Sequence, residues 1–154
     1  MYKCCIFDLD GTLVNSIYAI QKSVNDTLSY WNMREISVEE SRLYVGDGYK
    51  KLLERSLIAC GDTELTHYEE AVERYQDVFR KCCMYRVEAY QGIRELLEFL
   101  KSHGIFIAVL SNKPHPRTLD NVEGVFGSGY FDLVYGERED KGIKKKPCPD
   151  GIWA

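Results

Sequence analysis

Two carboxylates near the start of the chain, Asp8 and Asp10, are separated by one residue and directly follow an apolar run at residues 4–7. A continuous apolar run of this kind is typical of a buried parallel strand, and such strands present ligand-handling side chains at their carboxyl ends. Gly11 permits the chain to curl away from the sheet after the pair. Paired carboxylates can supply a nucleophile and a general acid to one reaction, so this strand end is the first candidate site.

The string that holds both carboxylates, DLDGTLV at residues 8–14, strongly resembles the first motif of the haloacid dehalogenase-like (HAD) phosphatases. The resemblance implies an aspartyl-phosphate mechanism, in which Asp8 attacks phosphorus and Asp10 protonates the leaving oxygen and later activates water. It also implies Mg²⁺, bound by one oxygen of Asp8, the backbone carbonyl of Asp10 and a phosphate oxygen. The ion would screen the two anions that must meet.

Two later stretches resemble the second and third motifs of the same superfamily. Ser111 and Asn112 follow an apolar run, and the resemblance implies that the Ser111 hydroxyl and Asn112 bind the phosphoryl group. Donors placed in advance stabilise the charge that spreads over the equatorial oxygens. Lys146 precedes Pro147 in the string KKKPCPD, which implies a fixed cation between nucleophile and phosphate. The prolines stiffen the segment that presents this cation.

Alternating apolar patterns predict the elements that must position these residues. Strands are expected at 4–7, 105–110 and 131–135, and core helices at 91–103 and 117–122. Strands that alternate with helices predict an α/β fold with a parallel Rossmann-like sheet and right-handed crossovers. About three strands of this sheet are present, so the HAD core is expected to be incomplete.

Residues 15–88 interrupt that alternation with an all-helical pattern. Capping-box sequences at Ser37 and at Thr66 predict the starts of two of its helices. We therefore expect three segments: the first part of the HAD core at 1–14, a helical cap at 15–88, and the second part of the core at 89–154.

The placement of this insert resembles the C1-capped branch of the superfamily, in which a helical cap follows the first motif. A cap that closes over a site excludes water and orients the substrate. Within it, Gly46, Asp47 and Gly48 resemble the specificity loop of phosphoglycolate phosphatases. Glycines let backbone amides approach a small anion closely. The resemblance therefore implies a small phosphorylated metabolite as the substrate.

Composition limits the other classes of function. The chain has 154 residues, a net charge of −4, 45% hydrophobic and 29% charged residues, so a nucleic-acid footprint is not expected. No apolar stretch has membrane-spanning length and no signal segment precedes the first strand, which makes a cytoplasmic protein without a membrane partner the default expectation. The six cysteines lack zinc-like spacing. Oligomeric state and physiological substrate are left open by these patterns.

The family pattern also has a fourth motif, a strand ending in Gly-Asp with a further acid, which has no counterpart before Ala154. We therefore expect a chain shortened at its C-terminus, with weaker Mg²⁺ binding, reduced turnover and an open apolar edge at residues 4–7. Two alternatives to a phosphatase stay open: phosphotransfer like that of β-phosphoglucomutase, and a catalytically inactive fragment or interaction module.

Overall fold

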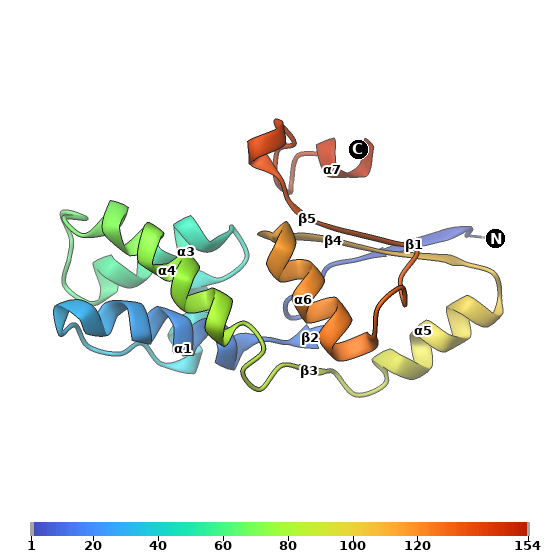
Figure 1. The fold of residues 1–154 in the computed structure, drawn as a ribbon, viewed down its shortest axis with the longest axis horizontal. Coiled ribbons are helices and arrows are strands. Elements are labelled where there is room, and N and C mark those ends of the chain that lie inside the picture. Colours follow the sequence, from blue (N-terminus) through green and yellow to red (C-terminus); the bar gives the residue numbers. More distant parts are fainter. Residues whose placement is uncertain (1, 154) are drawn as a thin grey trace. The chain divides into compact units, whose positions relative to one another are not determined.

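The computed structural model describes residues 2–153, which form two compact units. One unit contains the sheet and comprises residues 2–15 and 87–153 (the sheet unit), and the other comprises residues 16–86 (the helical unit). Figure 1 shows both units, with most of their elements labelled. None of the helices within residues 2–153 combines the length and the apolar character needed to cross a bilayer.

The sheet unit is built on a three-stranded parallel sheet within the described residues. Its strands β1 (Cys4–Phe7), β4 (Phe106–Pro114) and β5 (Leu133–Glu137) lie in the order β1-β4-β5. Phe7 is in register with Val109, and Val109 with Val134. Because parallel strands need long crossovers, helix α5 (Ile93–Ser102) precedes β4 and helix α6 (His115–Phe126) joins β4 to β5. The predicted α/β fold with a parallel sheet is confirmed.

The core of the sheet unit lies between β4 and the two helices, which Figure 1 shows on one side of the sheet. Its fully or nearly buried apolar side chains come from the middle of β4, from α5 and from α6: Ile107, Ala108, Val109, Leu97, Leu100, Val122 and Phe126. Each large apolar side chain that leaves water contributes about 1.5–3 kcal/mol. Among the described residues β1 pairs in this sheet only with β4, and Ile6 on β1 is 50% exposed.

The structure extends or shifts several predicted elements of this unit. Strand β4 does not end at Leu110 but continues, after an irregularity in register, to Pro114, which is in register with Glu137 of β5. Helix α6 begins directly afterwards, with Pro116 in its first turn, where a missing N–H costs little. Strand β5 lies two residues later than predicted. A short antiparallel pair, β2 (Val14–Asn15) with β3 (Glu88–Ala89), was not predicted.

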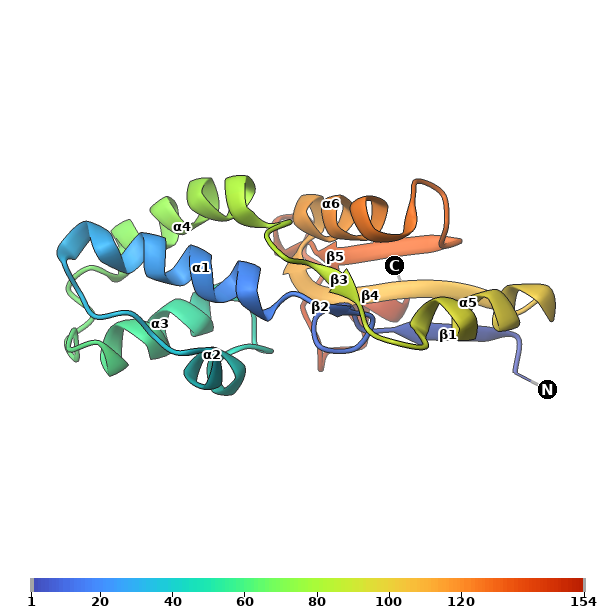
Figure 2. The same ribbon diagram turned by 90° about the horizontal axis from the view of Figure 1, so that it is seen from below.

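The helical unit contains α1 (Ile17–Leu28), α2 (Val38–Tyr44), α3 (Tyr49–Ala59) and α4 (Tyr68–Cys82). Figure 2 shows α1 and α4 side by side, and these two helices are in contact. Their buried faces and those of α3 form one apolar cluster: Ile20, Val24, Leu28, Leu52, Leu53, Leu57, Ala71, Tyr75 and Phe79. Ile36, which precedes α2, belongs to the same cluster. Each helix contributes residues spaced three to four positions apart, because residues so spaced share a helix face.

One of the two predicted capping boxes is confirmed and the other is wrong. Ser37 accepts a bond from the Glu40 backbone N–H while the Glu40 carboxylate accepts from the Ser37 N–H. The bond from the Arg34 side chain is the larger cause, and the bond from the Ser37 N–H the smaller cause, of a pKa of Glu40 lowered to about 2. At α4 the N-cap residue is His67 and makes no side-chain cap bond. The Asp62 carboxylate instead accepts bonds from two backbone N–H groups just before the helix.

Replacing Asp62 with asparagine is expected to destabilise the protein by about 1 kcal/mol at pH 7, because the amide keeps one acceptor oxygen but leaves one of the two backbone N–H groups without its charged acceptor. Burial raises the pKa of Asp62, but the N–H groups of His67 and Thr66 outweigh it and leave the pKa below its ordinary value of 3.8. A lowered pKa stabilises the fold above the unfolded-state value, and this contribution disappears as the pH falls through the folded-state value.

Urea unfolding at pH 7 and at pH 3 measures this effect. The difference between wild type and Asp62→Asn should shrink at the lower pH. Asp77→Asn, which alters an exposed carboxylate on α4, is the matched control and should change stability by less than about 0.5 kcal/mol. An Asp62→Asn deficit that is no larger than the control's at pH 7 contradicts the assignment.

Candidate active site

The loop after β1 holds the two carboxylates of the first motif. The Leu9 carbonyl accepts bonds from the N–H groups of Leu13 (3.0 Å) and Val14 (3.1 Å), and these three side chains are fully buried. Gly11 has φ +78°, a conformation that favours glycine, so the curl expected at this position is present. The buried anchors fix a tight turn from which Asp8 is presented exposed and Asp10 partly buried.

Asp8 is paired with the lysine that the third motif predicts. Lys146 Nζ lies 2.8 Å from Asp8 Oδ1 and also donates to the Leu110 carbonyl at 2.8 Å. The Leu9 backbone N–H donates to the same Asp8 oxygen at 2.8 Å. Residues from β1, from β4 and from the segment after β5 therefore meet at the carboxyl end of the sheet, as parallel strands require.

The segment that carries Lys146 is held by two side chains. Asn112 Oδ1 accepts from the Lys146 N–H at 2.8 Å, and Asn112 Nδ2 donates to the Lys146 carbonyl at 3.1 Å. Asp150 accepts from Cys148 Sγ at 3.0 Å and from the Lys144 N–H at 3.2 Å, and these two bonds keep the pKa of Asp150 below its ordinary value. The structure thus shows Asn112 clamping Lys146, while its direct contact with phosphate stays a prediction.

A second lysine, which was not among the predicted site residues, pairs with Asp10. Lys113 Nζ lies 2.9 Å from Asp10 Oδ1, and the Lys113 side chain is 4% exposed. Ser111 is also buried, and its Oγ accepts from the Lys113 backbone N–H at 3.1 Å. The sequence signal was a lysine near the end of a strand that begins with an apolar run, two residues after the predicted phosphate ligand Ser111.

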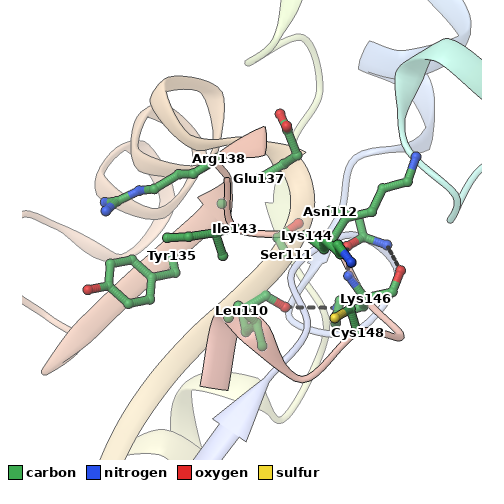
Figure 3. Close-up of a pocket in the computed structure, with 13 residues that line it drawn as sticks. Leu110, Ser111, Asn112, Tyr135, Glu137, Arg138, Ile143, Lys144, Lys146 and Cys148 are labelled. Carbon is green, nitrogen blue, oxygen red and sulfur yellow. Dashed lines mark hydrogen bonds between the residues drawn. The ribbon is translucent and has the colours of Figure 1, made fainter. Parts of the chain in front are cut away.

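A pocket opens beside these residues at the end of the sheet (Figure 3). Its lining has four basic side chains and one acidic one, and it combines the end of β4, the end of β5 and the segment that follows: Leu110, Ser111, Asn112, Tyr135, Gly136, Glu137, Arg138, Ile143, Lys144, Lys145, Lys146, Cys148 and Gly151. In Figure 3, Asn112 and Lys146 lie at one end of the pocket and Tyr135 at the other. Positive side chains around a small pocket favour an anionic ligand.

The oxygen atoms available at this edge suit a small hard cation. Mg²⁺ is usually held by one or two carboxylates together with waters and phosphate oxygens of the substrate. The Asp8 carboxylate and the Asp10 backbone carbonyl, the predicted ligands, are donors of this type. Within residues 2–153 no cluster of three or more His, Cys, Asp or Glu side chains could hold a metal by itself. The oxygens of Asp8 and Asp10 therefore fit part of the coordination shell of such an ion.

The predicted specificity loop connects α2 to α3 in the helical unit. Gly46 and Gly48 both have positive φ, +122° and +87°. Arg55 on α3 donates to the Tyr44 carbonyl at 2.9 Å and pairs with Asp47 at 2.5 Å. The loop is thus held in one conformation by an arginine that follows it, although its role in choosing a substrate stays a prediction.

A family model described as haloacid dehalogenase-like hydrolase matches residues 5–154. Among curated relatives, a phosphoglycolate phosphatase from Nitrosospira multiformis is 31% identical over 149 residues, with 96% of this chain and 65% of the relative covered. A phosphoglycolate phosphatase from Aquifex aeolicus is 34% identical over 154 residues, with 97% and 67% covered. The chain thus spans about two thirds of the length of these relatives.

Solved structures show the same fold. A predicted phosphoglycolate phosphatase from Haemophilus somnus superposes with a TM-score of 0.87 at 24% identity, covering 99% of this chain and 69% of that one. A predicted phosphatase from Clostridium acetobutylicum gives 0.80 at 28% identity, covering 99% and 68%. Roughly a third of each of these two structures has no counterpart in this chain.

Proposed function

Because this chain belongs to the haloacid dehalogenase-like hydrolases, we propose that it hydrolyses a small phosphate monoester, similar to phosphoglycolate, through a covalent aspartyl-phosphate on Asp8. The observation that carries this proposal is the 2.8 Å contact between Asp8 and Lys146 at the carboxyl end of the sheet. An exposed carboxylate held beside a fixed cation can meet an incoming phosphate dianion. The names of the curated relatives support the choice of substrate class.

In the first step the Asp8 carboxylate attacks phosphorus, and the bond between phosphorus and the ester oxygen breaks. Asp10 gives a proton to the departing oxygen, so that an alcohol leaves. Lys146 lies beside the attacking carboxylate and balances the negative charge gathered there. Ser111, whose oxygen accepts a bond from the Lys113 backbone, keeps its hydroxyl proton for an oxygen of the phosphoryl group.

In the second step water attacks the phosphorus of the aspartyl-phosphate and transfers a proton to Asp10. The bond between Asp8 and phosphorus breaks, which releases inorganic phosphate and restores the carboxylate. Splitting one difficult displacement into two is the advantage of a covalent nucleophile. Asp8 and the Asp10 carbonyl would hold Mg²⁺, which supplies charge screening between nucleophile and substrate.

Replacing Asn112 with alanine is expected to lower kcat/KM about ten- to a hundredfold, because Lys146 loses both bonds that fix its backbone. Displacement of a catalytic group by about 1 Å can cost 10²-fold. Steady-state phosphate release measures the effect. Gln91→Ala, which removes an exposed amide from the sheet unit, is the control and should leave the rate unchanged. Wild-type kinetics in Asn112→Ala would show that the clamp is not needed.

The proposal is tested by incubating the protein and Mg²⁺ with phosphoglycolate and, separately, with β-glucose 1-phosphate. We expect phosphate release from phosphoglycolate and no accumulation of glucose 6-phosphate. Isomerisation of the sugar phosphate without phosphate release would support a phosphotransferase instead. Absence of both activities, together with no heat of binding for Mg²⁺ and vanadate, would favour a non-catalytic protein. The role of Gly46, Asp47 and Gly48 in selecting among substrates remains part of this proposal.

A further inference from the structure

We propose that Lys113 is a positioning residue: it holds the carboxyl group of Asp10 in the place from which Asp10 protonates the leaving oxygen. This inference deepens the proposed function and rests on it. It starts from a contact between positions far apart in the chain, since Lys113 at the end of β4 reaches Asp10 in the loop after β1.

The pair is built into the interior rather than laid on the surface. Lys113 Nζ lies 2.9 Å from Asp10 Oδ1, and the two side chains are 4% and 19% exposed. By comparison, Asp8 and Lys146 are 44% and 31% exposed. Lysine is almost never buried to this degree unless it is paired. The contact therefore accounts for the burial of Lys113.

The backbone of Lys113 is fixed on both sides of its side chain. Its N–H donates to Ser111 Oγ at 3.1 Å, and its carbonyl accepts from Thr118 Oγ1 at 3.1 Å. Gly136 of β5 packs so closely that a Cβ atom there would lie 2.6 Å from the Lys113 carbonyl oxygen. The ammonium group therefore extends from a rigid support, and it ties Ser111 and Asp10 into one network.

The contact between Lys113 and Asp10 affects the protonation of the leaving oxygen and not the attack on phosphorus. A general acid must lie within hydrogen-bond reach of the oxygen that it protonates. A side chain fixed at one carboxylate oxygen has few remaining orientations, so the Lys113 contact decides where Asp10 can present a proton. Attack by Asp8 does not need this contact. Lys113 should therefore matter in proportion to how much the leaving oxygen needs a proton.

The test compares two substrates in Lys113→Met, a replacement of similar length and shape. An aryl ester, p-nitrophenyl phosphate, has a leaving group that departs without protonation, whereas the alkoxide of phosphoglycolate does not. We expect kcat/KM to fall about a hundredfold for phosphoglycolate, at the lower end of what a placed acid contributes, and less than about threefold for the aryl ester. The parameter kcat/KM reports only the steps up to and including the first irreversible one, which is departure of the leaving group. Hydrolysis of the aspartyl-phosphate therefore does not affect the comparison.

Three further variants make the outcome decisive. Lys3→Met, at an exposed lysine of the sheet unit, should change neither rate. Thr118→Val removes one support of the Lys113 backbone, so kcat/KM should again fall more for phosphoglycolate than for the aryl ester, but by a smaller factor. This variant replaces Lys113→Met in the test if Lys113→Met does not fold. Equal losses on both substrates, or no loss, would overturn the inference and leave Lys113 a structural residue. An Asp8→Asn variant that is as active as wild type would instead overturn the proposed function.

Discussion

Replacing Asp8 with asparagine is expected to reduce phosphate release from phosphoglycolate by about 10⁴-fold or more, the scale on which removal of a covalent nucleophile acts. The amide has nearly the same shape as the carboxylate but cannot attack phosphorus. Asp8 is exposed and lies outside the buried core, so the fold should survive the change. Steady-state assays with Mg²⁺, together with circular dichroism of the purified variant, separate loss of chemistry from loss of folding.

Asp120→Asn is the matched control for this variant. Asp120 lies on α6 in the same unit, is 41% exposed against 44% for Asp8, and also pairs with a basic side chain, that of Arg117. Its replacement should leave the rate within about twofold of wild type, as surface ion pairs contribute little. An Asp8→Asn enzyme that keeps a tenth of wild-type activity would exclude Asp8 as the nucleophile.

Replacing Lys146 with methionine is expected to lower kcat/KM by about 10²- to 10³-fold, as loss of a placed electrostatic donor does. The ammonium group that lies 2.8 Å from Asp8 Oδ1 is lost, and the nucleophile then faces the phosphate dianion without a balancing charge. Both KM and kcat should worsen, because the cation acts on the bound substrate and on the developing charge. Initial rates over a range of substrate concentrations separate the two parameters.

Lys141→Met is the control for Lys146→Met, because it removes the same charge from an exposed position after β5 that does not line the pocket, and it leaves the bonds of Lys146 to Asn112 in place. It should cost less than about threefold. A loss in Lys141→Met equal to that in Lys146→Met would mean that the segment acts through its overall charge. The assignment of Lys146 would then be wrong.

Much of the fold follows from the sequence because its signals are local. The apolar runs at 4–7 and 105–110 predicted two neighbouring strands, and the capping box at Ser37 predicted the start of α2. The extension of β4 to Pro114 could not be predicted, since it depends on pairing with Glu137 in a distant segment. The start of α4 differs because Asp62, outside the local pattern, supplies the acceptor that Thr66 was expected to provide.

The residues of the candidate site also divide into those that local sequence patterns predict and those that depend on distant parts of the chain. Asp8 and Lys146 stand in recognisable strings, and the structure brings them within hydrogen-bond distance. Lys113 was missed as a site residue because its importance arises from a partner more than a hundred positions earlier in the chain and from burial, neither of which local spacing reveals. Asn112 was predicted as a phosphate ligand, whereas its observed bonds to the Lys146 backbone depend on how two loops meet.

The central claim is that Asp8 carries the phosphoryl group during turnover. Protein quenched during hydrolysis of phosphoglycolate with Mg²⁺ can be reduced with borohydride, which converts an aspartyl-phosphate to homoserine, and then digested and analysed by mass spectrometry. We expect homoserine at position 8, dependent on substrate and on Mg²⁺. Conversion at another acidic residue, or turnover in which no residue of the chain is converted, would contradict it.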